Sequence, residues 1–522
     1  MRIPIYKRIY NVLWPKEPFR LVQKTYATQM NMEEDTANRQ AVHFSTGATS
    51  YGSVDNVKSN EETQNTTYQH EFKEIGKNSI PLIFTFVLQS SLSMMTIFFV
   101  GRLGALELGA VSLANVTFTV TSAVFIGMAT CLDTMCPQAF GAKQYRLVGL
   151  YFQRSCAISF VFAIPIALIW YYSSALLSRI IDDPALVNIS SRYLRVMILS
   201  IPGYVVFESG KKFLQAQGNF TTGQHILFIC APLNMVLNYL LVFKLDLGYI
   251  GAPIATTLSY NLMGLFLICY ICYKNITTED TEETPDCWNR IESWDEIFSN
   301  WKPMISLAVP GIIMIEAEFL AFELLTVLAA KFGTTVLAAQ SVTASIQSLT
   351  FQVPFSIGVA ASNRIAYHIG TKNIWNCQIA TRTTVIQLGS IVGFGNFLLL
   401  LLGRYKISSL FSNDPEVVEI AAKLLPIIGV NQLYDVFNVL AAGCLRAQGR
   451  QKIGGYLNLA AYYLLGLPLA VLLAFKYNMK AQGFWIGLGC GILVLALSEL
   501  CCLYKSNWPK IVKNSQNLHN KK

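Results

Sequence analysis

From Ile80 onward, the chain alternates long apolar runs with short polar turns. Each run has about twenty residues, the length that an α-helix needs to cross the hydrocarbon core of a bilayer. We therefore predict an all-α polytopic membrane protein with twelve transmembrane helices. The approximate spans are 80–100, 111–132, 149–172, 191–212, 223–243, 250–273, 304–330, 336–361, 380–402, 418–441, 453–475 and 481–504.

The segments around these runs predict five parts of the chain. Residues 1–77 are polar and predict a disordered cytoplasmic N-terminal tail. Residues 274–303 begin acidic and then carry aromatic residues at near-helical spacing, which predicts a cytoplasmic linker with an interfacial helix. An N-lobe at 78–273 and a C-lobe at 304–505 hold six spans each, and 506–522 is a cytoplasmic C-terminal tail.

An internal repeat relates the two predicted lobes. Six spans separate each matched pair, so the halves run in the same direction and should be related by an axis along the membrane normal. This predicts two pseudo-symmetric six-helix lobes. The matches are Gly104/Gly333, Leu108/Leu337, Ala110/Ala339, Ser112/Ser341, Gly141/Gly370 and Lys143/Lys372 at an offset of 229, and Asp183/Asp414, Pro184/Pro415, Leu214/Leu445, Ala216/Ala447, Gln217/Gln448 and Gly218/Gly449 at an offset of 231.

Composition and charge agree with this interpretation. The chain is 53% apolar and only 14% charged, and its net charge of +9 comes from short basic groups between apolar runs. Such groups are a topology signal, so no nucleic-acid partner is expected, and the side richer in Lys and Arg is predicted to be cytoplasmic with both termini. The twelve cysteines lie mostly in apolar runs and predict no disulfide framework. Cys269 and Cys272 form a CxxC without a nearby histidine, so no metal site is expected.

Acidic residues inside one span are the strongest chemical signal. Glu316, Glu318 and Glu323 lie within Val309–Ala330, which has no basic residue. Each would cost about 2.5–3.5 kcal/mol at mid-membrane, so an ion or proton site is the default interpretation. Asp435, deep in another span, is a second candidate. Helix geometry separates Glu316 and Glu318 by about 160° and leaves open which face lines a cavity.

Three further carboxylates, Asp133, Glu208 and Glu499, lie near predicted cytoplasmic helix ends, where we expect them to reach water or cap helices. Neutral polar residues inside the spans are candidates for the wall of a substrate cavity between the lobes. They are Gln89, Asn115, Asn234, Asn238, Gln432 and Tyr434.

A cavity with carboxylates on one side and aromatic residues around it suits organic cations. A carboxyl group there can hold a proton until a cation competes for it, which outlines an exchange mechanism. The chain has no HExxH, GxSxG or Walker motif and no paired histidines, so neither an enzyme nor a cofactor is predicted. The expected partners are small organic cations, protons and membrane lipids, and the protein is expected to be a monomer.

Several runs resemble motifs of eukaryotic, fungal-type multidrug and toxic compound extrusion (MATE) transporters, and together they cover nearly all of residues 78 to 505. The clearest is CLDTMCPQAFGAKQYRLVGLYFQRS, from Cys131 to Ser155. The others are Phe99–Asn115, Lys212–Gly218, Pro232–Phe243, Val353–Asn373 and Leu433–Gly454.

This resemblance implies a twelve-helix, two-lobed exporter that exchanges organic cations or weakly basic aromatic compounds for protons. The family's proton site in the second lobe falls on Glu318, Glu323 and Asp435, whereas Glu316 is an additional acid. Leu320 replaces a usual aromatic residue. In the signature, Pro137 and Phe140 replace the usual Gly and Tyr. These departures affect the expected substrate range more than the reaction.

Alternatives stay open at this stage. Sodium can replace protons at carboxylates, so a sodium-coupled exporter is the first. A lipid-linked sugar flippase of the same superfamily would need a cationic cavity. A membrane-embedded enzyme or a channel would belong to other classes. The membrane itself is the plasma membrane or a vacuolar or other organelle membrane, since both have an acidic far side.

Overall fold

The structure is a computed structural model, and the part of the chain that it describes is entirely helical or irregular, without strands. The described residues are 65–179, 181–277, 287–288, 292–412 and 414–519.

The chain divides into two compact units. The unit described below comprises Asn65–Leu503 and Ile511–Lys522. Of the other unit, only Tyr504–Lys510 belongs to the described residues. Most of the predicted N-terminal tail, residues 1–64, lies outside them.

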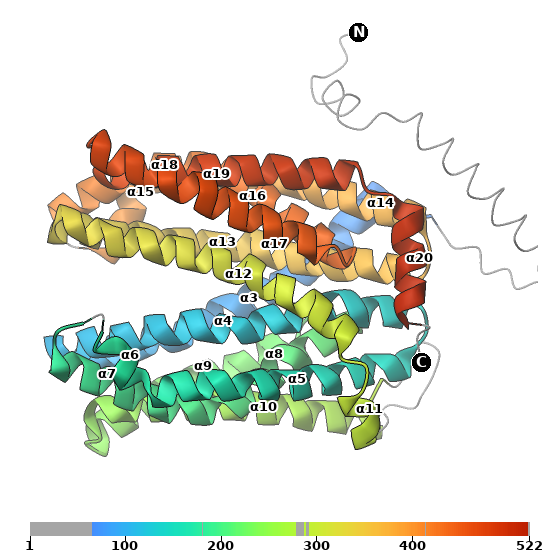
Figure 1. The fold of residues 1–522 in the computed structure, drawn as a ribbon, viewed down its shortest axis with the longest axis horizontal. Helices are drawn as coiled ribbons and strands as arrows, with labels where there is room; N and C mark the ends of the chain where they lie inside the picture. Colours follow the sequence, from blue (N-terminus) through green and yellow to red (C-terminus); the bar gives the residue numbers. More distant parts are fainter. Residues whose placement is uncertain (1–64, 180, 278–286, 289–291, 413, 520–522) are drawn as a thin grey trace, which may run out of the picture. The chain divides into compact units, whose positions relative to one another are not determined.

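The first lobe contains six long helical segments that lie side by side (Figure 1). Two of them change helix type along their length, through the 3₁₀ turn η1 (Ile198–Ser200) and the π turn η2 (Leu240–Lys244). The segments are α3 (Tyr68–Val100), α4 (Ala105–Gly141), α5 (Tyr145–Tyr171), α7 (Pro184–Met197) continued by α8 (Ile201–Ala216), α9 (Thr222–Tyr239) and α10 (Gly251–Thr277), with the short α6 (Ser173–Leu177) and η3 (Gly248–Ile250) between them.

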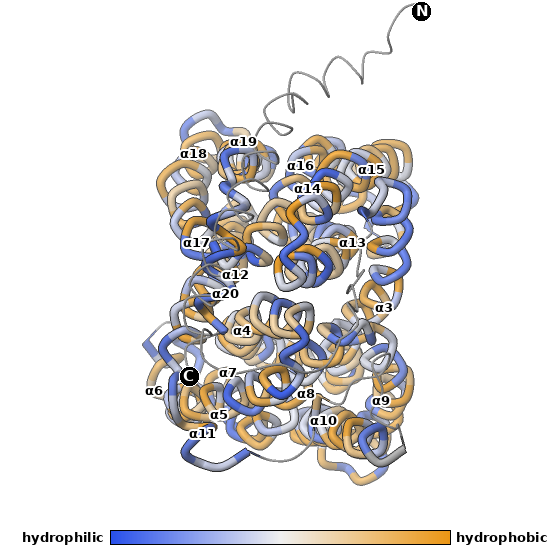
Figure 2. The backbone as a smooth tube through the Cα atoms, turned by 90° about the vertical axis from the view of Figure 1, so that its right-hand side faces the viewer, coloured by the Kyte–Doolittle hydropathy of each residue, from blue (hydrophilic) through white to orange (hydrophobic). Residues whose placement is uncertain are grey.

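The second lobe also contains six long segments, and Figure 2, viewed along the helices, separates the two groups. Three π turns occur in this lobe: η5 (Thr383–Leu388), η6 (Ala460–Gly466) and η7 (Leu472–Lys476). The segments are α12 (Lys302–Ala329), α13 (Thr334–Gly370), α14 (Ile374–Arg382) continued by α15 (Gly389–Phe411), α16 (Pro415–Ala447), α17 (Gln451–Leu459) continued by α18 (Leu467–Val471), and α19 (Lys480–Tyr504), with η4 (Ala330–Phe332) after α12.

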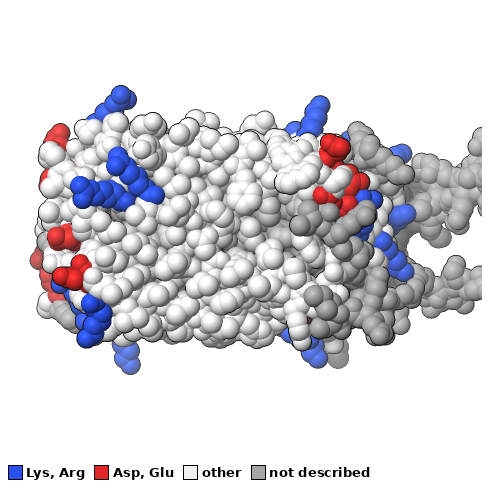
Figure 3. All heavy atoms as spheres, turned by 90° about the horizontal axis from the view of Figure 1, so that it is seen from below, with Lys and Arg blue, Asp and Glu red and all other residues white. Residues whose placement is uncertain are grey.

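Charged side chains gather at the two ends of the helices. On the face drawn in Figure 3, Lys, Arg, Asp and Glu lie at the ends, and a wide band without them separates the two groups. Within the described residues, nine helical segments are long and apolar enough to cross a membrane. Segment α7–α8, α12 and α13 lie alongside them and complete the twelve. We call the end with α11 (Trp294–Phe298) the linker end.

The repeat found in the sequence reappears in the backbone. Lys143 (φ 58°) and its match Lys372 (φ 61°) are both left-handed. Gly218 (φ 77°) and its match Gly449 (φ 68°) are left-handed as well, a conformation that glycine adopts without steric cost. The repeated sequence positions therefore specify the same turns in both lobes.

A second repeated pair starts a helix in each lobe. Asp183 caps α7, where its Oδ1 accepts a hydrogen bond from the Ala185 backbone N–H at 2.9 Å. Asp414 caps α16 and accepts one from the Glu416 N–H, also at 2.9 Å. The proline after each aspartate occupies the first turn, where a missing N–H costs nothing.

Within the described residues of the predicted linker, the helix α11 forms and is five residues long. Residues 278–286 and 289–291 of the linker lie outside the described part of the chain. Arg146 of α5 fixes this region, because its guanidinium lies 2.8 Å from carboxylate oxygens of both Glu292 and Glu296. The linker is thus tied to the N-lobe by charge-assisted hydrogen bonds.

The helix α20 (Trp508–His519) packs through its Ile511–His519 part against α4 and α5. Ser515 Oγ donates to Gln138 Oε1 at 2.7 Å, and His519 Nδ1 lies 3.0 Å from the Tyr151 hydroxyl oxygen. Burial lowers the pKa of His519 to about 4, because the charged imidazolium loses water there. A helix that follows the C-lobe in sequence is therefore bound to the N-lobe.

Candidate functional site

The two lobes pack most closely near the linker end, through glycines. A Cβ atom on Gly141 of α4 would overlap the Tyr367 carbonyl oxygen of α13. A Cβ on Gly370 of α13 would likewise overlap the Gln138 carbonyl oxygen of α4. These two glycines are the repeat-related pair, so each lobe presents the same small residue to the other.

Further contacts close the same region. Thr134 Oγ1 donates to the Arg446 carbonyl at 2.6 Å, and Gln138 Nε2 donates to the Ala447 carbonyl at 2.8 Å. Both bonds connect α4 with the end of α16. The lobes are therefore held together by backbone-level contacts at this end.

An ion pair also joins the lobes there. Arg364 of α13 lies 2.9 Å from the carboxylate of Glu71 on α3, and His368 Nε2 lies 3.2 Å from the same oxygen. Glu71 is fully buried. A buried carboxylate with a guanidinium partner holds its helices in register, because separating them would leave the charge unpaired.

A cavity of about 380 Å³ opens between the lobes on the far side of these contacts. On α4, for example, the cavity residues Phe118 to Ile126 precede the contact residue Gly127, which meets Ile312 of α12. Its lining is aromatic, hydroxyl-bearing and acidic. The lining residues are Phe86, Gln89, Ser90, Ser93, Met94, Ile97, Phe118, Thr119, Ser122, Ile126, Tyr204, Glu208, Tyr260, Ile315, Glu318, Phe319, Ser348, Phe351, Gln352 and Phe355.

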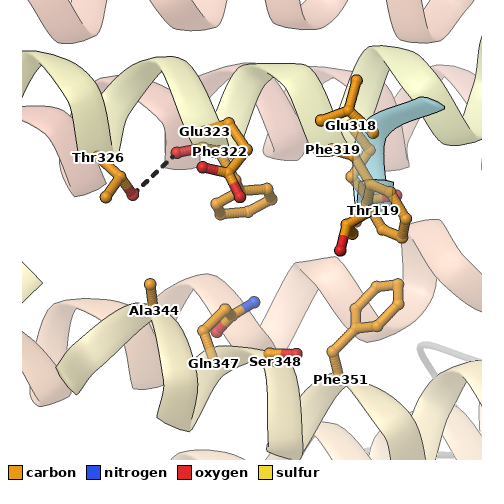
Figure 4. A pocket seen from close by; sticks show the side chains of 11 residues that line it. Thr119, Glu318, Phe319, Phe322, Glu323, Thr326, Ala344, Gln347, Ser348 and Phe351 are labelled. Carbon is orange, nitrogen blue, oxygen red and sulfur yellow. Dashed lines mark hydrogen bonds between the residues drawn. The ribbon is translucent and has the colours of Figure 1, made fainter. Parts of the chain in front are cut away.

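A second cavity of about 240 Å³ adjoins it between α12, α13 and α4. The two cavities share Thr119, Glu318, Phe319, Ser348 and Phe351 in their walls. Figure 4 shows side chains from α12 and α13 pointing into the space between these helices. The remaining lining residues are Val120, Phe322, Glu323, Thr326, Ala344 and Gln347.

Two of the predicted glutamates line these cavities. Glu318 belongs to both walls, and Glu323 belongs to the second. The face of α12 between them is formed by Phe319, Phe322 and Thr326, at the spacing of one helix face. The glutamates therefore stand at the two edges of a mostly apolar strip.

Asp435 lies behind the wall of the second cavity and is connected to it by the side-chain amide of Gln347. It is buried on α16, and Gln347 Nε2 of α13 donates to its Oδ2 at 3.3 Å. Gln432 Nε2 donates to Gln347 Oε1 at 2.7 Å, and Asn396 Nδ2 donates to Gln432 Oε1 at 2.9 Å. This chain of amides connects the cavity wall with Asp435 and fixes the orientation of Gln347.

Sequence reasoning did not identify Gln347. It lines the second cavity and also contacts Asp435, so it joins two predicted sites. The available signal was an amide in the middle of an otherwise apolar span, which is the same signal that selected Gln89. Gln432, which was predicted to line the cavity, instead lies in the layer behind it and is fully buried.

Glu316 is separate from this group. It is half-buried, lines neither cavity, and its Oε1 has no hydrogen-bond partner among the described residues. Tyr463 of η6 lies within its electrostatic range. Seven residues separate Glu316 from Glu323, so both point in similar directions from α12, but Glu316 lies nearly two turns closer to the linker end.

The N-lobe side of the cavity holds a paired acid. Glu208 Oε1 accepts hydrogen bonds from Lys211 Nζ at 2.9 Å and from Gln89 Nε2 at 2.7 Å. Lys211 Nζ also donates to Gln89 Oε1 at 2.9 Å and lies 4.9 Å from the centre of the Phe207 ring. The predicted cavity residue Gln89 thus lines the cavity and bridges a buried ion pair.

The prediction that Asp133, Glu208 and Glu499 reach water is wrong. All three are buried. Asp133 pairs with Lys212 at 2.8 Å, as Glu208 does with Lys211. Proximity to a helix end in sequence did not bring these side chains to the surface, because α4, α8 and α19 turn them into the lobes.

The remaining predicted cavity residues lie away from both cavities. Asn115 accepts a hydrogen bond from the Tyr193 hydroxyl at 3.1 Å within the N-lobe. Asn234 Nδ2 donates to Ser259 Oγ at 3.0 Å, and Asn238 donates in turn to the Asn234 side chain at 3.1 Å. Tyr434 donates to the side chain of its neighbour Asn431. These side chains therefore bond to neighbours inside the helix packing, although Asn115 Nδ2 and Asn238 Oδ1 have no hydrogen-bond partner among the described residues.

Two repeat-related helical lobes around a cavity with acidic residues in its wall are the architecture of a secondary membrane transporter. The chain belongs to the MatE family, whose profile matches residues 81–240 and 310–472. The predicted family and the twelve-helix, two-lobed fold are confirmed, and the protein is a multi-pass membrane transporter and not an enzyme.

Relatives and solved structures support this assignment. An uncharacterized transporter of Saccharomyces cerevisiae is 42% identical over 448 residues, covering 85% of this chain. The chain spans 63% of the length of that yeast relative. Protein DETOXIFICATION 16 of Arabidopsis thaliana is 31% identical over 87% of this chain and 92% of its own. The crystal structure of the eukaryotic MATE transporter AtDTX14 matches with a TM-score of 0.80 and 29% identity, over 86% of this chain and 99% of that one.

Proposed function

We propose that this transporter exports organic cations or other xenobiotics in exchange for protons, by alternating access of its two lobes. The observation that carries the proposal is the position of Glu318 in the shared wall of both cavities. No hydrogen bond or ion pair from a basic side chain reaches it among the described residues. A carboxylate in such a place needs a proton or a cation to neutralise it.

The walls of the cavities support a cationic, partly aromatic substrate. Within the described residues, no Lys or Arg lines either cavity, whereas Glu318 and Glu323 do. Phe319, Phe351 and Tyr260 offer ring faces that attract cations. The same lining argues against a lipid-linked sugar flippase, because a pyrophosphate group would need basic partners.

A transport cycle follows from the closed linker end. With that end cytoplasmic, together with both termini, the cavities of this conformation face the outside or an organelle lumen. A proton arriving from that acidic side would neutralise Glu318 and release the bound cation. Deprotonation after the lobes reopen toward the cytoplasm would prepare the site for the next substrate. Gln347 would transmit the change of charge to Asp435, because its amide contacts both regions.

We place the protein in the plasma membrane or a vacuolar or other organelle membrane, as a monomer surrounded by lipid. Large apolar side chains exposed along the helices would meet lipid; Leu402 and Leu464, for example, are each 79% exposed. Sodium is the alternative coupling ion, since carboxylates bind either ion. It is separated from protons by the experiment below.

The test is transport by purified protein in liposomes. An imposed pH gradient should drive uptake of a fluorescent dye cation or tetraethylammonium, and replacing sodium by choline at fixed pH should leave the rate unchanged. Glu318→Gln should abolish gradient-driven uptake, because an amide cannot exchange a proton. Glu419→Gln is the matched control, since Glu419 is exposed on α16 and pairs only with the exposed Lys423. Gradient-driven uptake by Glu318→Gln would refute the role of Glu318, and a sodium requirement would select the alternative ion.

Glu316→Gln then decides the role of the third glutamate. Because Glu316 lines neither cavity, we expect this variant to transport with the same pH dependence as the parent protein. A loss of gradient-driven uptake would instead place Glu316 in the coupling site.

A further inference from the structure

Several polar groups inside the C-lobe are buried and have no hydrogen-bond partner among the described residues. Glu499 of α19 is completely buried, and neither of its carboxyl oxygens has a partner. The same holds for the hydroxyl of Tyr462 in η6. Arg446 at the end of α16 is buried, and its Nε and Nη2 also lack partners. Buried polar groups are ordinarily paired, so this cluster requires an explanation.

The cluster lies next to the proposed proton site. A Cβ on Gly454 of α17 would lie 2.8 Å from Met314 Sδ and 3.6 Å from Glu499 Oε1. The Met314 side chain and the Glu499 carboxyl therefore lie at about the same height along α12. Glu318 is four residues further on, one helical turn from Met314 on the same face. Glu499 thus lies about one turn from Glu318, toward the linker end.

Charge balance connects these groups. Arg446 lies close enough to attract both Glu318 and Glu499, and those two carboxyls repel each other. The carboxylate of Asp435 also repels that of Glu318. One guanidinium cannot neutralise three carboxylates, and a surplus charge inside a membrane domain is strongly unfavourable. The cluster therefore needs two further positive charges, which protons or a substrate cation can supply.

We infer that Glu499 is a second proton-binding site of the C-lobe, which keeps its proton while Glu318 exchanges its own proton for the substrate cation, and which shares Arg446 with Glu318 as a counter-ion. The inference rests on the proposed proton coupling at Glu318. Its role is to keep a proton inside the lobe while Glu318 is occupied by the substrate cation. The lobe then stays neutral in both halves of the cycle.

The proton count then balances. Without substrate, Glu318 and Glu499 each carry a proton, and the charge of Asp435 is balanced by Arg446. When the substrate cation arrives, the carboxyl of Glu318 gives its proton to water in the cavity and its carboxylate pairs with the cation, while Glu499 keeps its proton.

In the described part of the chain, the charged and titratable groups that interact with Glu499 come from α12, α16 and η6. They are Glu318, Arg446, Cys444 and Tyr462. The nearby residue of α17, Gly454, has no side chain.

Infrared difference spectroscopy of the purified full-length protein tests the inference directly. A neutral carboxylic acid has a C=O stretching band that disappears on deprotonation and shifts in D₂O. Adding tetraethylammonium should remove one such band in the parent protein, and one protonated-carboxyl band should remain. Glu499→Gln should lose that remaining band, and a pH-indicator dye should report the same proton release as in the parent protein, because Glu318 still exchanges its proton. Glu419→Gln should keep both bands.

Two outcomes are decisive. If the parent protein loses a band on substrate addition and Glu499→Gln retains the second band, Glu499 is not the second site. If the parent protein shows neither band change nor proton release, the proposed proton coupling itself fails.

Discussion

The two lobes share a fold and a repeat, but their buried carboxylates differ in whether a basic side chain is paired with them. In the N-lobe, Glu208 and Asp133 each lie within 2.9 Å of a lysine ammonium. In the C-lobe, Glu318 and Asp435 have no basic hydrogen-bond partner among the described residues. Both lobes therefore contain buried acids, and they differ in whether a basic side chain is hydrogen-bonded to those acids.

This contrast separates structural from exchangeable charge. A carboxylate with a resident ammonium is neutralised permanently, so it fixes the packing of its helices. A carboxylate without a resident ammonium must bind a proton or a cation from the cavity to become neutral. The sequence suggested that Asp133 and Glu208 reach water or cap helices, but the structure shows both of them buried and already neutralised by lysines.

The largest effect should come from breaking an N-lobe pair. Lys211→Met leaves Glu208 buried without its ammonium, and losing one partner of a buried pair costs about 3–5 kcal/mol. We expect the thermal unfolding midpoint in detergent, followed by tryptophan fluorescence, to fall markedly. The double variant Lys211→Met with Glu208→Gln should recover most of the loss. If the single variant is as stable as the parent protein, the N-lobe pair is not structural.

A middle-sized effect should come from the glycines at the closed end. Gly141→Ala would place a methyl group against the Tyr367 carbonyl, and Gly370→Ala would do the same at Gln138. Because each methyl pushes the lobes apart, we expect more of the cytoplasm-open state. Labelling of a cysteine introduced at Thr134 by a water-soluble maleimide should then speed up in both variants. Equal labelling in parent and variants would show that the closed end tolerates the added volume.

The smallest effect should come from the helix caps that the repeat places in both lobes. Asp183→Ala and Asp414→Ala each remove a side-chain acceptor from a helix N-terminus, at a cost of about 1 kcal/mol. Similar small decreases of the unfolding midpoint are expected from chemical denaturation. Strongly unequal decreases would mean that the lobes differ in stability as well as in charge.

The fold could be predicted because its signals are periodic and repeated. Apolar length fixed the twelve spans, and repeated dipeptides such as Asp183-Pro184 marked the same helix start in both lobes. Helix ends were less certain. The first span starts at Tyr68, twelve residues before the predicted boundary at Ile80, because a polar first turn capped by Thr67 continues the helix beyond the apolar run.

The site was predicted in part. An acid in an apolar span is costly wherever its helix lies, so Glu318 and Glu323 could be selected without coordinates. Pairing could not be predicted, because basic residues near the span ends, such as Lys211 and Lys212, were interpreted as a topology signal. The amide of Gln347 acquired its role only through contact with Asp435, 88 residues away in sequence. The sequence alone does not reveal contacts between residues that are far apart along the chain.

The reciprocal glycine contact near the linker end has the geometry of a two-fold symmetric dimer interface. Gly141 contacts the chain around Tyr367, and Gly370 contacts the chain around Gln138. The two glycines are 229 residues apart, and so are Gln138 and Tyr367. A surface of this kind is self-complementary, so one six-helix half could pair with a copy of itself. Joining the halves in one chain makes that pairing independent of concentration, and leaves each half free to change its charges separately.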